Sequence, residues 1–416
     1  MKKVFISLVT AMLLFSACGS DDIQTEVDNS DKVGSLKLEV AFEGVNQQTK
    51  AGSAAAPITS WSNVKQVQMF LYDKTTGNIA FSYTIHPSTG NTTFPWTNIP
   101  VGTYDIALVA NVKSSTDNVA TSISGGPITS ANSVEFTDFN VRGKKINTQV
   151  FMDLKPTTFP ANHTFQTGDK AYSEASEVFT AYAQDVTIQE GVTTTLGSAM
   201  ALKREVALMR VRVNKNASFL NESGKEVNFA HANNFIVIHR LPVGFGLKTQ
   251  TPKFLGGIVT ANSDENRIMI GATGASTFKT ADPAATAYKP TGIIDSDFKL
   301  WRDIIVLPNV VKTEPEVSPS SNAENSRKYF VVISAMAPAG YELADGTKTD
   351  VAKPIYWSGV ISEVFSSNII REVNLTIKSR GDDKNPDGPK AEGGLIIEVT
   401  QPEPWNKNIE SSNKEV

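Results

Sequence analysis

Short runs of β-branched, aromatic and aliphatic residues, separated by turns, recur along this chain and constrain its fold more than any other feature. The cleanest run, over 35–43, alternates apolar with polar residues, so one buried face would carry Leu36, Leu38, Val40 and Phe42. Similar runs follow at 64–72, 79–85, 102–111, 235–239, 304–311, 329–335, 373–377 and 395–399. Together these runs predict an all-β protein of the sandwich type with at most minor helix.

Length and composition set the scale of the fold. The 416 residues are 40% hydrophobic, which is enough for real cores, and single cores seldom grow beyond about 250–300 residues. We therefore expect two domains, with a boundary near 190–200. The 39 basic and 43 acidic side chains give a net charge of −4, so no basic surplus points to a nucleic-acid partner.

The N-terminus has the features of an export signal. A basic start at residues 1–3 is followed by an apolar run over 4–15 and by two small residues directly before Cys18, the only cysteine of the chain. The run is too short to span a bilayer, and residues 1–17 resemble a lipoprotein signal peptide, with Phe15 where a leucine is usual. Lipid on Cys18 would tether the exported protein to the outer membrane; the alternative is a chance cysteine in an ordinary secretory leader.

Several segments, in order, resemble the fimbrillin family, whose members form the type V pili of gut and oral anaerobes. The residues that carry the resemblance are the signal at Cys18 and the segments 67–72, 102–105, 109–111, 182–188, 202–207, 306–309, 373–378 and 395–400 with Trp405. The resemblance implies two transthyretin-like Greek-key β-sandwich domains, here 51–192 and 193–416. It further implies a propeptide, 18–50, that contains the first strand at 35–43 and is removed by a protease.

Removal of the first strand would leave a groove that another subunit fills, according to the same resemblance. A trypsin-like processing protease could cut between Lys50 and Ala51, which lie in a polar loop, although the family usually has arginine there; an ordinary surface loop is the alternative. The segment 391–416 would supply the replacement strand through Leu395, Ile397, Val399 and Trp405. The alternative is that these residues form the last strand of their own second domain.

Little in the sequence points to chemistry. Of the four histidines, His231 and His239 flank a strand-like run and do not have the spacing of metal ligands, and His86 and His163 lie far from them. The segment 383–388 imitates the start of a calcium loop, but the twelfth position holds glycine where a glutamate is needed. We therefore expect no enzyme activity, no metal and no cofactor.

The sequence thus predicts the major shaft subunit of a surface fimbria, a lipoprotein first and a head-to-tail polymer with other copies and other pilus subunits later. Two other roles stay open. A tip or anchor subunit of the same pilus is one, and a surface glycan-binding lipoprotein is the other. The second would need exposed aromatic platforms, which any of the five tryptophans could supply, namely Trp61, Trp96, Trp301, Trp357 and Trp405.

Overall fold

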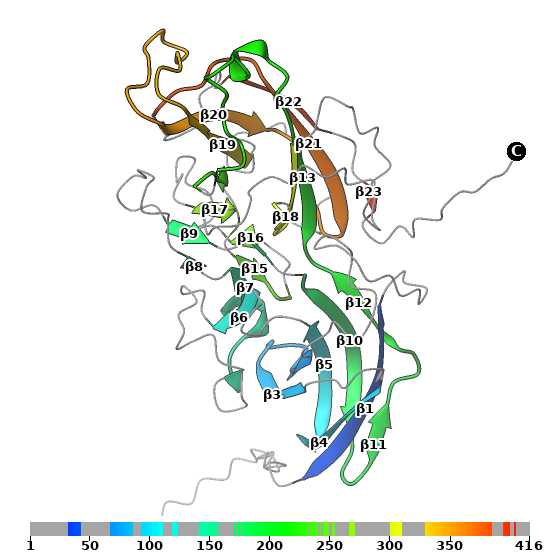
Figure 1. Ribbon diagram of the computed structural model, residues 1–416. Helices are drawn as coiled ribbons and strands as arrows, with labels where there is room; N and C mark the ends of the chain where they lie inside the picture. Colours follow the sequence, from blue (N-terminus) through cyan, green and yellow to red (C-terminus); the bar gives the residue numbers. More distant parts are fainter. Residues whose placement is uncertain are drawn as a thin grey trace, which may run out of the picture.

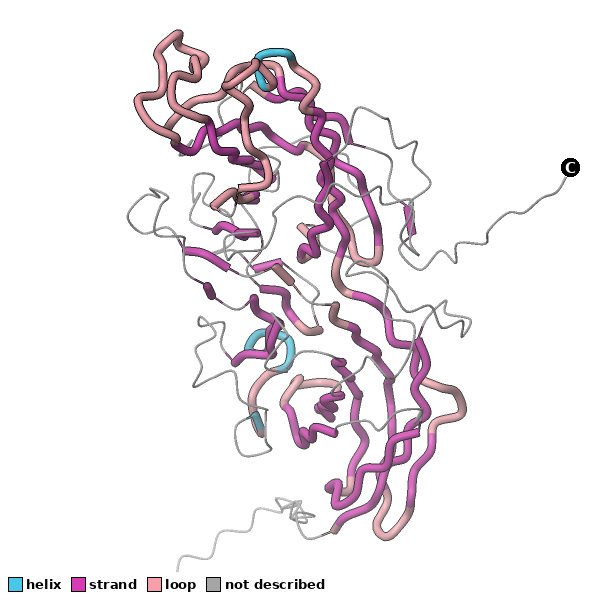
Figure 2. Tube along the Cα trace, viewed as in Figure 1, coloured by secondary structure: helices cyan, strands magenta, loops and turns pink. Residues whose placement is uncertain are grey.

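The structure is a computed structural model, and strands make up most of the part of the chain that it describes (Figures 1 and 2). The described residues are 32–42, 67–85, 93–110, 119–123, 141–154, 156–157, 170–172, 174–175, 177–231, 233–239, 242, 244–248, 252–253, 266–270, 300–309, 329–384, 394–399 and 403–404. Within them, the helical residues are Val141, α2 (Ile146–Gln149) and the 3-10 turn η3 (Ser218–Leu220), and no helix is long and apolar enough to cross a membrane. The predicted all-β class is confirmed.

The first sheet has the strand order β11–β1–β12–β10–β5–β2–β3. The short strands β11 and β12 pair with successive parts of β1 on one side, and β4 pairs with β1 on its other side. The two ends of the sheet, β3 and β4, also contact each other, so the sheet rolls around its own core. The strands are β1 (Val33–Phe42), β2 (Val67–Tyr72), β3 (Ile79–Ile85), β4 (Thr93–Pro100), β5 (Gly102–Ala110), β10 (Phe179–Ile188), β11 (Thr193–Thr195) and β12 (Met200–Arg204).

Three further sheets lie beyond the rolled sheet. One has the order β18–β13–β21–β22 with β23 also on β21, one has the order β20–β19–β14–β17–β9–β8, and one has the order β16–β15–β7–β6. Their strands are β6 (Val119–Ile123), β7 (Val150–Leu154), β8 (Pro156–Thr157), β9 (Lys170–Tyr172), β13 (Ala207–Asn214), β14 (Ile236–His239), β15 (Gly244–Gly246), β16 (Pro252–Lys253), β17 (Asn266–Ile270), β18 (Leu300–Val306), β19 (Tyr329–Ala337), β20 (Lys353–Ile361), β21 (Ile369–Ile377), β22 (Leu395–Val399) and β23 (Glu403–Pro404).

Two large hydrophobic cores stabilise the described part of the chain, beside a small third cluster around Phe235 and Phe330. The smaller of the two large cores fills the rolled sheet and includes side chains from β1, β2, β4, β5, β10 and β12. The larger one includes the opposite face of β2 and β5 together with strands of the other sheets. This core joins early and late parts of the chain, because apolar side chains from 206–213 and 370–377 pack in the same cluster as Phe70 and Val109.

The chain passes from the first sheet to the next between β12 and β13, which follow each other directly (Figure 1). The predicted boundary at 192/193 lies earlier, before β11 and β12, which still belong to the first sheet. Buried polar contacts stabilise the passage. Arg204 donates to Glu177 at 2.9 Å and to Asn368 at 2.8 Å, and Glu205 accepts hydrogen bonds from Thr180 and Ser367. The division into two Greek-key domains stays a prediction.

Candidate functional site

Strand β1 is an interior strand of the rolled sheet, although it comes from the start of the described chain. On one side it pairs antiparallel with β4, with Leu36 opposite Trp96. On the other side it pairs parallel with two consecutive short strands, with Ser35 opposite Thr193 in β11 and Val40 opposite Met200 in β12. Both edges of β1 are therefore in use.

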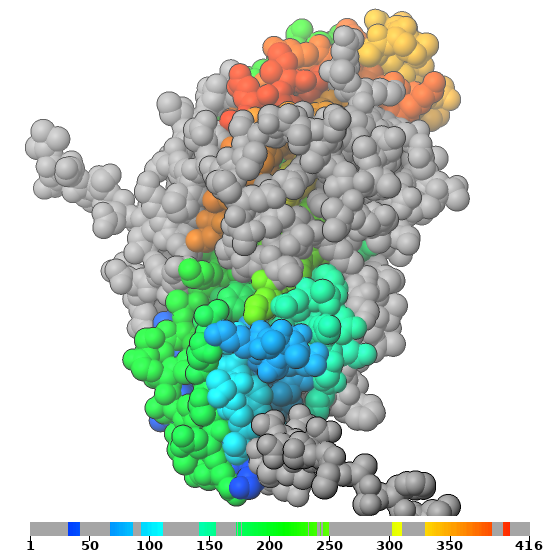
Figure 3. Space-filling view, turned by 180° about the vertical axis from the view of Figure 1, so that it is seen from behind, coloured from blue at the N-terminus to red at the C-terminus, as the bar shows by residue number. Residues whose placement is uncertain are grey.

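The side chains of β1 alternate between the core and the solvent. Leu36, Leu38 and Val40 are fully buried, with 0% of each exposed, whereas Lys37 and Glu39 point outward. The buried row packs in the smaller core, which also contains Trp96 and Leu202. On the face seen from behind, only small deep-blue patches of β1 are visible (Figure 3). This strand is thus a structural part of the core and not a surface addition.

The first residues of β1 fit closely against the turn between β10 and β11. The Ser35 amide donates to the carbonyl of Val192 at 2.9 Å, and the carbonyl of Val33 accepts from Gly191 at 3.0 Å. At Gly34 an added Cβ would lie 2.2 Å from the carbonyl oxygen of Gln189, a distance that real structures do not show. Only glycine fits at this point of β1 without a shift of the backbone.

Without β1, the first sheet would lose its closure. In the pairing of the described strands, β4 has β1 as its sole ladder partner, and β12 would keep only β10. The apolar side chains of β4 that fill the core, Phe94, Trp96 and Ile99, would then face an open groove. An unpaired edge beside an apolar groove is a ready binding site for another strand.

The C-terminal segment lies at an edge of its own second sheet. β22 pairs antiparallel with β21 over 395–399, and β23 continues beside the start of β21. The side chains of Leu395, Ile397 and Val399 are only partly buried, and Ile396 is 48% exposed. Ile397 also packs on Gly359 of β20, where a Cβ would lie 2.4 Å from its Cδ1 atom. In the single chain, this segment is therefore the last strand of its own second sheet.

Several predicted site residues lie outside the described residues. These are Cys18, Lys50, Ala51 and Trp405, and the side chain of Phe42 is not described either. Their roles in lipidation, cleavage and strand exchange stay predictions. Of the five tryptophans, the two whose side chains are described, Trp96 and Trp357, are each 1% exposed, so neither offers a platform to a sugar.

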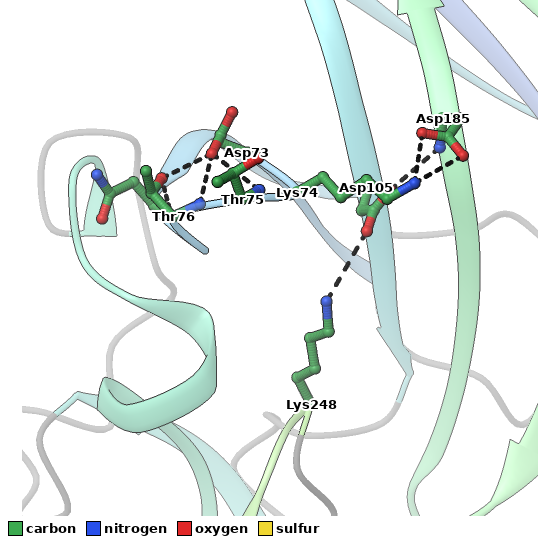
Figure 4. A network of polar contacts seen from close by, with 8 residues as sticks. Asp73, Lys74, Thr75, Thr76, Asp105, Asp185 and Lys248 are labelled. Carbon is green, nitrogen blue, oxygen red and sulfur yellow. Dashed lines mark hydrogen bonds and ion pairs between the residues drawn. The ribbon is translucent and has the colours of Figure 1, made fainter.

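A polar network that the sequence analysis missed ties the rolled sheet to residue 248 (Figure 4). Asp105, buried in β5, accepts from the amide of Asp185, which has φ +56° at an irregularity of β10. Lys74 donates to both oxygens of Asp185 at 3.0 Å, which raises the pKa of Lys74. Lys248 lies 3.8 Å from Asp105 and over the ring of Tyr72. No local sequence pattern could have revealed contacts between such distant residues.

The described side chains contain no group of three His, Cys, Asp or Glu residues placed to hold a metal ion. Burial raises the pKa of Glu174 to about 7. Its carboxyl group accepts a hydrogen bond from the amide of Ile305 at 2.8 Å and lies 3.5 Å from the guanidinium of Arg302. These contacts hold Glu174 against β18.

Comparisons with known proteins give the family. A family model described as Fimbrillin-A associated anchor proteins Mfa1 and Mfa2 matches residues 29–234. The chain is similar to solved structures of a candidate cell adhesion protein from Bacteroides eggerthii DSM 20697 (TM-score 0.46, 11% identity, 90% of this chain and 96% of that chain) and of a fimbrilin from Porphyromonas gingivalis W83 (TM-score 0.42, 11%, 90% and 98%). It is also similar to the tip fimbrial protein Mfa3 of Porphyromonas gingivalis with a C-terminal truncation (TM-score 0.36, 14%, 90% and 100%). None of the curated proteins matches the sequence.

The family match runs from before β1 to beyond β13, so it includes every strand of the rolled sheet that contains the β1 position. It spans about half of the chain, and the family consists of structural fimbrial proteins rather than enzymes. The chain is a member of the fimbrillin family.

Proposed function

We propose that this chain is a shaft subunit of a cell-surface fimbria and that it polymerises by strand exchange. A protease removes β1 together with the lipidated N-terminus, and the C-terminal strand of a neighbouring copy takes the position of β1. The observation that carries the proposal is the contrast between the two strands: β1 is completely buried on its inner face, whereas β22 is partly buried at a sheet edge.

The contrast has an energetic consequence. Burying Leu36, Leu38 and Val40 contributes roughly 5–9 kcal/mol at about 1.5–3 kcal/mol for each side chain, an upper bound because unfolded chains are partly compact. This is comparable to the stability of a whole domain, about 5–15 kcal/mol. A copy that has lost β1 should therefore bind a replacement strand strongly, and a strand that leaves a half-buried edge gains burial when it moves there.

Timing follows from the order of the predicted processing steps. Lipid on Cys18 holds the precursor at the outer membrane while β1 closes the rolled sheet, so the precursor stays monomeric. A cut after Lys50 would release the lipid and β1 together. The surface location, the self-polymer and the role of a trypsin-like protease are parts of this proposal.

The test is limited digestion of purified full-length precursor with a lysine-specific protease, followed by a denaturing gel of unheated samples. The proposal expects a ladder of polymers and a new N-terminus at Ala51. A Lys50→Ala variant should give neither, while the matched Lys32→Ala variant, changed at an exposed lysine beside β1, should behave like the parent. A clean cut at Lys50 with a product that stays monomeric would contradict the proposal.

An anchor subunit is the second candidate, and the description of the matching family model favours it. An anchor would keep Cys18, its lipid and β1, and would accept no incoming strand at this position. It would therefore remain bound to membranes after protease treatment, and Cys18→Ser would release it. A shaft subunit would leave the membrane after the cut, because the cut after Lys50 removes the lipid together with β1.

A further inference from the structure

The C-terminal segment repeats the sequence of β1. Residues 34–41 read GSLKLEVA and residues 393–400 read GGLIIEVT, with glycine, leucine, glutamate and valine at four matching positions. We infer that residues 393–400 of a second copy enter the position of β1 in the same direction as β1, with Gly393 in the place of Gly34. This inference rests on the proposed strand exchange and assigns its register and polarity.

The close fit at Gly34 is the first argument. An added Cβ would meet the carbonyl oxygen of Gln189 at 2.2 Å and the Cγ2 atom of Ile188 at 2.8 Å. An incoming strand must therefore bring a glycine to this point, or the backbone of the turn must move. Gly393 stands at this point when the two segments are aligned in the same direction.

The buried row is the second argument. With Gly393 at the position of Gly34, Leu395, Ile397 and Val399 take the positions of Leu36, Leu38 and Val40. Leucine and valine are unchanged, and the exchange of leucine for isoleucine conserves volume. Glu398 then points outward like Glu39, which is exposed.

The opposite direction fails at the same point. In a reversed strand, each placement that keeps at least two of the three apolar side chains in the buried row puts Val399, Gln401 or Glu403 at the position of Gly34. Each of these residues has a Cβ, and no space exists there for one. The space at Gly34 thus selects the direction as well as the register.

The resting place of the segment differs from the proposed one. In its own chain β22 runs antiparallel to β21, and Gly394 has a φ of +77°, which favours glycine. In the β1 position Gly394 would replace Ser35, a strand residue whose φ is not positive. Glycine adopts both conformations readily, so Gly394 would serve as the hinge at which the segment changes between the two places.

The first experiment tests the fit inside the full-length chain and needs no polymer. Four substitutions convert residues 34–41 into a copy of 393–400: Ser35→Gly, Lys37→Ile, Leu38→Ile and Ala41→Thr. We expect this variant to unfold cooperatively within about 3 °C of the parent, because the buried volume is conserved. A control that carries residues 401 to 394 in reverse order over 34–41, QTVEIILG, keeps the apolar row but puts glutamine at position 34, and it should lose more than about 10 °C or fail to fold. The inference is wrong if both variants lose the same stability.

The second experiment reads the register in the polymer. Full-length chains with Cys18→Ser carry one new cysteine each, are mixed in pairs and are treated with the protease. In β1, Lys37 lies opposite Thr195 and Ala41 opposite Ala201, so the inference expects disulfides for the pair Ile396→Cys with Thr195→Cys and for the pair Thr400→Cys with Ala201→Cys. No reversed register gives both.

The outcomes separate the inference from the function on which it rests. Polymers that form only one of these disulfides, or neither, overturn the register and leave strand exchange in place. If no polymer forms after the cut, strand exchange fails, and the thermal comparison of the forward and reversed variants alone decides whether 393–400 fits the position of β1.

Discussion

One alanine substitution in β1 and one in β22 would compare how much buried side chains stabilise each strand. Leu38 of β1 has no exposed surface, and replacing a fully buried leucine with alanine costs about 2–5 kcal/mol. Ile397 of β22 is only partly buried, so Ile397→Ala should cost roughly half as much. Strand exchange in the proposed direction requires this order of the two costs.

Hydrogen–deuterium exchange of the full-length precursor measures the loss of stability that each substitution causes in its own strand. A loss of 2 kcal/mol raises the rate of amide exchange about thirtyfold when exchange follows opening of the strand. We expect Leu38→Ala to accelerate exchange in β1 and β12 by at least this factor, and Ile397→Ala to accelerate exchange in β22 by less. Equal effects, or a larger one in β22, would refute the reasoning, because the C-terminal strand would then lose burial when it moved.

Three further predictions concern the described contacts. Burial raises the pKa of Glu174 from 4.5 to about 7, so between these pH values the folded protein holds a proton that the unfolded chain has released. The free energy of unfolding should therefore fall as pH rises from about 4.5 to 7. Glu174→Gln should flatten this pH dependence in urea titrations, and an unchanged dependence would show that another group causes it. Glu372→Leu removes the carboxylate that lies 2.9 Å from the buried Arg212 and should lower the free energy of unfolding by about 3–5 kcal/mol. A second change, Arg212→Met, should restore most of this loss. Thermal unfolding that shows no recovery in the double variant would contradict a role of the ion pair. Gly359→Val should displace Ile397 and β22 and so speed amide exchange in β22. The control Gly197→Ala, where an added Cβ meets open space, should leave this exchange unchanged. Equal exchange in the two variants would show that β22 does not depend on the contact between Ile397 and Gly359.

Local patterns were sufficient for much of the fold. The alternation over 35–43 predicted β1, and the runs at 79–85, 102–111 and 395–399 correspond to β3, β5 and β22. Alternation predicts a strand because one face meets a core and the other meets water. It cannot say which strands pair, and the parallel contact of Ser35 with Thr193 joins residues too distant for any local signal.

Two segments show where local patterns failed. Residues 193–199 are mostly small or polar and show no apolar strand pattern, but Thr193–Thr195 form β11, since pairing with β1 outweighs their small, polar character. Arg210 and Arg212 alternate with apolar residues in β13 and would be expected in water. Both are buried, because Asp303 and Glu372 on the flanking strands neutralise them. Such partners become visible only when the strands are placed side by side.

The N-terminal residue of the protein in fimbriae isolated from intact cells tests the central claim most directly. Intact mass and N-terminal sequencing would distinguish the two forms without any engineered change. Strand exchange predicts a chain that begins at Ala51 and has lost β1. A chain that begins at a lipidated Cys18 and still contains residues 33–42 would contradict it and identify a subunit that keeps its first strand.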